Sequence, residues 1–286
     1  MNIEKKLIDN FYKILESESK YKKVLSLEQI NKLSEIIGKS HKLVKYSKSI
    51  KNPLELVLNF YKEIFPELYP LIIEGINTKR IIFNNSKPVS YTSTIDGKCY
   101  IHFDKTDADL FMIAHEFGHY IAINSNPQII QAENINFGEV LSIYMEKRLE
   151  TYLINKYNLT DLVNTIRRNR LYFDENMLKI AKLEYIYENK YISGNLVLCD
   201  LDLNSILKIT RFKSDNIINN FLAFPLGNII SMYLIDNNIK IDNNLIDVLL
   251  NINIDELINK YANSFKSMGA IKNEKKGISN FFRKIS

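Results

Sequence analysis

The chain has 286 residues, of which 46% are hydrophobic and 25% are charged, with only 9 Gly and 6 Pro. This composition excludes disordered, collagen-like and low-complexity proteins, and it predicts a globular protein with a sizeable core. The 38 basic and 33 acidic residues leave a net charge of +5, which is too small an excess to indicate a nucleic acid partner.

Cysteine usage and hydropathy predict a cytoplasmic protein. Cys99 and Cys199 lie far apart and form no CxxC pair, so we expect a reducing compartment. Charges interrupt every short apolar run near the first residue, which excludes a typical signal peptide. The longest apolar stretch, residues 221–235, contains Pro225 and is too short for a membrane span. We therefore expect no stable membrane insertion, and the oligomeric state stays open.

The first 80 residues predict three helical segments and show no pattern typical of catalysis. The first segment has apolar residues at helical spacing: Ile3, Leu7, Phe11 and Ile14. Ser26 and Gln29 have the spacing of a capping box ahead of the second segment. Asn52 followed by Pro53 marks the start of the third.

The pattern changes to short β-like runs at Arg80 and returns to helical periodicity at Thr106. The runs cover residues 80–83, 89–95 and 98–103, and Asp96-Gly97 between the last two predicts an antiparallel hairpin. The predicted helices that follow cover residues 107–124, 136–157, 160–188 and 216–236, with shorter ones after residues 242 and 254. The predicted fold is mainly α with a small antiparallel hairpin.

The helix at 107–124 contains the sequence His115-Glu116-Phe117-Gly118-His119, which is an HExxH motif. Histidines four residues apart project from one face of a helix, so both imidazoles can bind one Zn²⁺ ion. Glu116 lies beside them, where its carboxylate can act as a general base on a water molecule without binding the metal. The sequence therefore predicts one zinc ion per chain, held by His115 and His119.

A catalytic zinc ion needs a third protein ligand and an open position for water. Asn126-Pro127 ends the helix, so the next helix can return antiparallel and present a carboxylate. The candidate acids are Glu133, Glu139, Glu146 and Glu150. Glu139, near the start of the returning helix, is the strongest candidate for the third ligand. Glu146 lies on the same face and can accept a hydrogen bond from a ligating histidine, whereas we expect Glu133 and Glu150 in solvent.

The motif and the following Glu139-Val-Leu-Ser-Ile-Tyr-Met-Glu146 resemble the thimet oligopeptidase and oligoendopeptidase F family of zinc metallopeptidases. The similarity covers residues 88–235, and the chain is shorter than full family members. The resemblance implies a mainly helical gluzincin core with a small hairpin beside the zinc helix. It also implies Zn²⁺ bound by His115, His119 and Glu139, with Glu116 as general base. Residues 1–80 would form an N-terminal helical region and residues 81–286 the catalytic region, or the two would form one continuous domain.

One departure from the family concerns the transition state. Family members present tyrosines shortly before a glycine of a later helix, whereas this chain has Phe224 ahead of Gly227. A hydroxyl donor is therefore absent from that position. Candidate replacements that could contact substrate or transition state are Tyr91, Tyr100, His102 and Tyr233. The edge of the hairpin could also bind the backbone of a peptide by β-augmentation.

The function that these patterns favour is a zinc-dependent metalloendopeptidase acting on short or unfolded peptides. Two alternatives stay open: a protease of narrow specificity that matures one precursor peptide, and a non-catalytic zinc-containing protein that binds peptides. The basic residues Lys272, Lys275, Lys276, Arg283 and Lys284 beside Phe281 and Phe282 could also contact a membrane surface or nucleic acid. A solvated tail explains that segment equally well.

Overall fold

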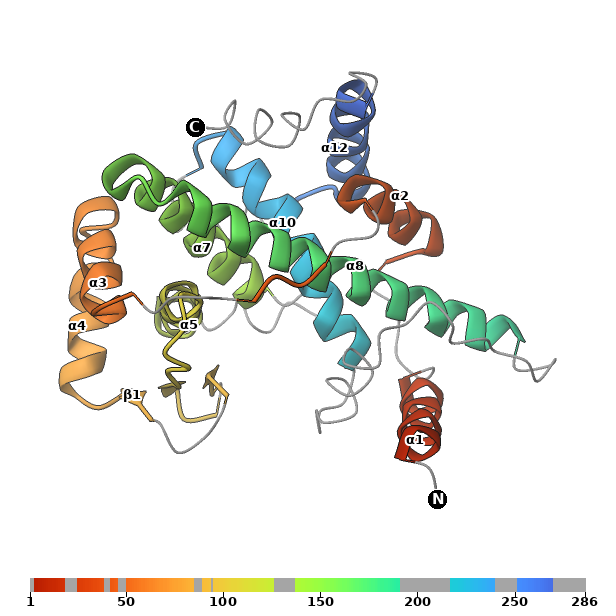
Figure 1. The fold of residues 1–286 in the computed structure, drawn as a ribbon, viewed down its shortest axis with the longest axis horizontal. Coiled ribbons are helices and arrows are strands. Elements are labelled where there is room, and N and C mark those ends of the chain that lie inside the picture. The colour runs from red at the N-terminus through yellow and green to blue at the C-terminus, as the bar shows by residue number, and fades with distance from the viewer. Residues whose placement is uncertain are drawn as a thin grey trace.

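The computed structural model describes residues 3–18, 25–38, 42–45, 50–84, 89–93, 95–125, 137–190, 217–239 and 251–269. The described chain is mainly helical with a small sheet, which confirms the predicted class at that level (Figure 1). Glu133, Cys199, the short helix expected after residue 242 and the basic segment from Lys272 to Lys284 lie outside the described residues.

Helices supply most of the described structure, and their bounds agree closely with the predicted ranges. They are α1 (Ile3–Glu18), α2 (Leu27–Ile37), α3 (Pro53–Ile64), α4 (Tyr69–Asn77), α5 (Asp109–Ser125), α7 (Phe137–Tyr157), α8 (Thr160–Lys190), α10 (Ile217–Asp236) and α12 (Ile254–Gly269). The capping box at Ser26 and Gln29 is confirmed, since each side chain bonds the backbone N–H of the other. The segment after Asn52-Pro53 forms two helices, because α3 ends at Ile64 and the next residue, Phe65, directly precedes Pro66.

The three short strands form one sheet of mixed direction. Strands β1 (Ile81–Phe83), β2 (Tyr91–Thr92) and β3 (Cys99–Ile101) lie in the order β1-β3-β2. β2 and β3 pair antiparallel, as the hairpin prediction requires, and Gly97 in their connection has φ of 62°. β1 pairs parallel with β3, which the sequence reading did not include. β3 is therefore central, and β2 is an edge strand beside α5.

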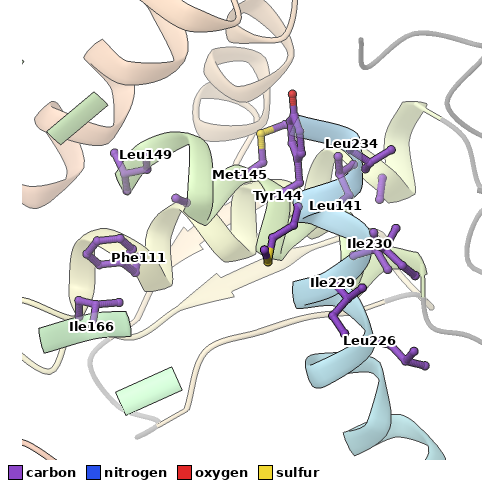
Figure 2. Packing of buried hydrophobic residues seen from close by; sticks show 14 of the residues in the cluster. Phe111, Leu141, Tyr144, Met145, Leu149, Ile166, Leu226, Ile229, Ile230 and Leu234 are labelled. Carbon is purple, nitrogen blue, oxygen red and sulfur yellow. The ribbon is translucent and has the colours of Figure 1, made fainter. Parts of the chain in front are cut away.

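Helix α7 lies at the centre of the packing. It contacts α5 along one side and α10 along another, and α8 follows it after a two-residue connection. Figure 2 shows buried side chains of α7, such as Leu141 and Tyr144, close to those of α10, such as Ile229 and Ile230. Because several neighbours cover α7, its buried residues are not confined to one stripe.

The remaining helices pack around this centre at its two ends. α3 and α4 contact α5, and they lie together at one end of the molecule in Figure 1. α2 contacts both α8 and α12 at the other end. Within the part of the chain that the structure describes, no helix combines the length and the apolar character that crossing a membrane requires.

Candidate metal centre

The two histidines of the motif lie on one face of α5, and their rings meet edge to face with an interplanar angle of 83°. Nε2 of His119 lies 3.1 Å from Nε2 of His115, and the ring centroids are 4.7 Å apart. The flanks of the motif are buried, as expected for a metal-bearing helix: Ile113, Ala114, Tyr120 and Ile121. The apolar surroundings therefore hold both imidazoles in a partly buried site.

Glu139 reaches both histidines from the first turn of α7. Its Oε2 lies 3.2 Å from Nε2 of His115, and its Oε1 lies 3.4 Å from Nε2 of His119. Ligands at 2.0–2.1 Å from a tetrahedral ion lie roughly 3.3–3.4 Å from one another, which agrees with the three measured separations. The two histidines and Glu139 could thus hold a metal ion.

A glycine of the motif allows α7 to approach α5 this closely. A Cβ atom added at Gly118 would lie 2.6 Å from the Cα of Ser142 and 3.0 Å from its Oγ. Any other residue would therefore collide with the α7 backbone one turn after Glu139. Gly118, the second x of HExxH, thus allows the carboxylate of the second helix to lie beside the histidines.

The chemistry of the three donors fits a cation. Oε2 of Glu139 is buried and forms no hydrogen bond of good geometry within the described residues. Burial raises the pKa of Glu139, but the charge of His119 and the close contact with His115 lower it more, so the carboxyl stays ionised. Burial lowers the pKa of His115, yet Glu139 and Glu146 raise it well above its ordinary value. A metal binds the unprotonated Nε2, so metal binding would release the proton that these two carboxylates favour on His115.

Glu146 orients His115, as the sequence predicts. Oε1 of Glu146 lies 2.7 Å from Nδ1 of His115. A carboxylate can only accept, so Nδ1 is the donor, and Nε2 is the nitrogen left to face Glu139. This contact fixes the ring so that its Nε2 points into the site.

A buried ionic network continues from Glu146 into α8, and the sequence reading missed it. Arg170 binds Oε2 of Glu146 and, at 2.9 Å, Oε1 of Glu150. Arg167 binds Oε2 of Glu150 at 2.8 Å. The expectation that Glu150 lies in solvent is wrong, because its residue is 2% exposed. The signal in the sequence was Glu146 and Glu150 one helical turn apart, with Arg167 and Arg170 similarly spaced on the next helix.

Glu116 is buried at the boundary between α5 and the sheet. The residue is 4% exposed, and its Oε2 accepts a hydrogen bond of 2.7 Å from the hydroxyl of Thr92 on β2. The sequence offered no signal for Thr92, because its contact depends on the register of the sheet. The described cluster that could hold a metal consists of His115, His119 and Glu139, and the role of Glu116 as a base beside the metal stays a prediction.

The four further candidates make the following contacts. The rings of Tyr91 and Tyr100 stack on each other with centroids 4.9 Å apart, and the Tyr100 hydroxyl bonds Asp96. His102 contacts the carbonyl of Asn84 and the carboxylate of Asp104.

Tyr233 lies near the end of α10, where the ammonium group of Lys260 lies 5.5 Å from its ring centroid. The structure thus brings together His115, His119, Glu139 and Glu146, and Glu116 follows His115 directly on α5. A role of the four other residues in binding substrate stays a prediction.

Phe224 forms an apolar wall of the site. Its ring, on α10, is nearly parallel to that of His115, with an interplanar angle of 7° and centroids 6.3 Å apart. The position that lacks the expected hydroxyl therefore does lie beside a candidate metal ligand. No family model, no curated protein and no solved structure matches this chain.

Proposed function

We propose that the protein is a zinc-dependent metallopeptidase that hydrolyses amide bonds in short or unfolded peptides. The observation that carries this proposal is the convergence of His115, His119 and Glu139, with Glu116 held beside them. Two imidazoles and one carboxylate are a ligand set of catalytic zinc sites, which leave one position open. A thimet oligopeptidase-like gluzincin core is part of the proposal and rests on the sequence resemblance.

The chain's own residues supply the proton chemistry. A zinc ion held by the three ligands would polarise the scissile carbonyl and lower the pKa of water from 15.7 toward about 7. Glu116 takes a proton from the attacking water as the water oxygen bonds to the carbonyl carbon. It then gives that proton to the amide nitrogen, and the C–N bond breaks to release an amine and a carboxylic acid. Glu146 keeps His115 oriented throughout.

Substituting Glu116 and Glu139 separates catalysis from metal binding. We expect Glu116→Gln to retain about one zinc per chain while peptide cleavage falls by about 10²–10⁴-fold, since the general base is lost and the ligands stay. Glu139→Ala should lose zinc as well, because only two ligands remain. The measurements are elemental analysis and a mixed-peptide digest read by mass spectrometry, on wild type and variants.

Glu74→Gln is the matched control, because this carboxylate is exposed on α4. It should leave zinc content and cleavage unchanged. Full cleavage by Glu116→Gln would contradict its role as base, and unchanged zinc content in Glu139→Ala would remove it from the ligands. Cleavage of very few sequences in the same digest would select a protease of narrow specificity.

A non-catalytic zinc-containing protein that binds peptides is the second candidate, and Phe224 favours it. Its ring lies against His115 and brings no hydroxyl to assist a transition state. Peptide affinity without hydrolysis, measured with saturating zinc, would select this candidate over the peptidase.

A further inference from the structure

A cross-strand pair of the small sheet faces the residue proposed as general base. Thr92 on β2 lies opposite Cys99 on β3. The Thr92 hydroxyl lies 2.7 Å from Oε2 of Glu116 and 3.5 Å from its backbone carbonyl oxygen. The buried Cys99 thiol lies 3.7 Å from the same carbonyl oxygen. Two neighbouring side chains of the sheet thus contact α5 at Glu116.

Backbone hydrogen bonds hold the edge strand that carries Thr92 in the sheet. The N–H of Ser93 donates to the carbonyl of Lys98 at 2.8 Å. Cys99, in turn, donates its N–H to the carbonyl of Arg80 at 2.8 Å, which ties the hairpin to β1. The strand limits the positions that the Thr92 hydroxyl can take. Its hydrogen bond therefore limits the orientation of the carboxylate that accepts it.

The contact uses one oxygen of Glu116 and leaves the other. Among the described residues, Thr92 donates to Oε2, and none donates to Oε1. A base must present a free oxygen toward the water that it deprotonates. Because the two oxygens belong to one rigid planar group, the hydrogen bond to Oε2 also sets the direction of Oε1.

We infer that Thr92 is a positioning residue whose hydroxyl holds the Glu116 carboxylate in the orientation that accepts a proton from the attacking water. The inference rests on the proposed function for its catalytic consequence, but the position of the carboxylate can be tested without it. A valine at position 92 would fill the same space and keep the strand, so the hydroxyl is the only group removed.

The kinetic test compares Thr92→Val with Thr92→Ser in the zinc-loaded full chain. We expect Thr92→Val to lower kcat about 10–100-fold, with KM within about threefold and zinc content unchanged. Thr92→Ser should keep kcat within about threefold of wild type, because it restores the hydroxyl. The matched control is Thr151→Val on α7, which removes a half-buried hydroxyl bonded to its own helix.

A second readout does not depend on peptide cleavage. Cobalt replaces zinc in such sites, and its visible absorption responds to the hydrogen bonding around the ion. We expect the cobalt spectra of Thr92→Val and Glu116→Gln to depart from wild type, and those of Thr92→Ser and Thr151→Val to match it.

A wild-type cobalt spectrum in Thr92→Val overturns the inference, and so does an unchanged kcat. If the wild-type chain binds cobalt but cleaves no peptide, the proposed function fails, and the spectra alone decide the role of Thr92. If it binds no cobalt, both proposals fail.

Discussion

The pKa of Asp174 is raised, whereas the pKa values of the buried acids near it are lowered, because fewer positive charges contact Asp174. Burial raises the pKa values of Glu146 and Glu150, but Arg170 lowers both to below their ordinary value. Asp174 on α8 is 1% exposed, and burial raises its pKa to about 7. The groups facing it are Arg170, Lys147 and Glu146, together with Asn228, which donates to its Oδ2. The folded protein thus holds a proton on Asp174 that the unfolded chain loses near pH 4.

Because the pKa of Asp174 is higher in the folded than in the unfolded state, the free energy of unfolding depends on pH in a known direction. Between about pH 4 and pH 7 the folded state binds more protons than the unfolded state, so stability falls as pH rises and levels off above about pH 7. Asp174→Asn removes the charge and retains an oxygen that can accept from Asn228. We expect the variant to flatten this decline and to be more stable by an order of 1–3 kcal/mol at pH 8.

Denaturant unfolding of wild type and variant at several pH values measures the effect. Asp161→Asn is the control, because its carboxyl is exposed at the start of the same helix. Parallel pH curves for wild type and Asp174→Asn would show that the carboxyl titrates alike in both states, contrary to the expectation.

The residues of the site that could be predicted are those whose contacts follow from helix geometry. His115 and His119 lie one turn apart on α5, and Glu146 lies two turns after Glu139 on α7, so their shared faces follow from spacing alone. Glu150 could not be placed in the interior, because its burial depends on which face of α8 turns toward α7. Thr92 could not be assigned either, since its neighbour Glu116 is set by sheet register and by packing on α5.

At the scale of elements, the small residues on either side of α7 decide where its carboxylate lies. Gly118 faces Ser142 from α5, and a Cβ at Gly227 of α10 would lie 2.6 Å from Cδ1 of Ile143. The obstacle at Gly227 is the end of a side chain, which can rotate. The obstacle at Gly118 is the α7 backbone, which can only move as a helix. Of these two contacts, the one between α5 and α7 therefore tolerates a larger side chain less well.

Gly118→Ala should consequently separate α5 from α7 and move Glu139 away from the histidines. We expect a loss of about 1–3 kcal/mol in the free energy of unfolding and zinc affinity at least about 10-fold weaker, because ligand separations change. Urea unfolding and a competitive zinc titration measure the two effects.

Gly75→Ala is the matched control for this change. Its Cβ would lie 2.7 Å from the ring end of Tyr120, on the side of α5 toward α4. It should lower stability and leave zinc affinity unchanged. Equal zinc affinity in Gly118→Ala and wild type would show that α7 can shift away from α5 while Glu139 stays beside the histidines.

At the scale of the whole molecule, an ion bound at this site would join two helices at the centre of the fold, α5 and α7. α5 carries two ligands and contacts α3, α4 and the sheet, whereas α7 carries the third and contacts α10 and α8. The site is thus connected directly to α3, α4, α8, α10 and two strands of the sheet through one helix or the other. Zinc bound there should stabilise the molecule as a whole, because the unfolded chain does not bring the ligands together.

Removing the metal therefore tests the architecture and the site in one measurement. Free zinc at about 100 times its Kd stabilises the folded state by about 2.7 kcal/mol, which corresponds to roughly 5–10 °C in Tm for a chain of this size. We expect a chelator to lower the wild-type Tm by that amount and added zinc to restore it. Glu116→Gln, which keeps all three ligands, should show the same shift, and Glu139→Ala should show almost none. A wild-type Tm indifferent to zinc, or a full shift in Glu139→Ala, would mean that these helices are not joined by a metal ion, because mass action requires a bound ion to stabilise the fold that binds it.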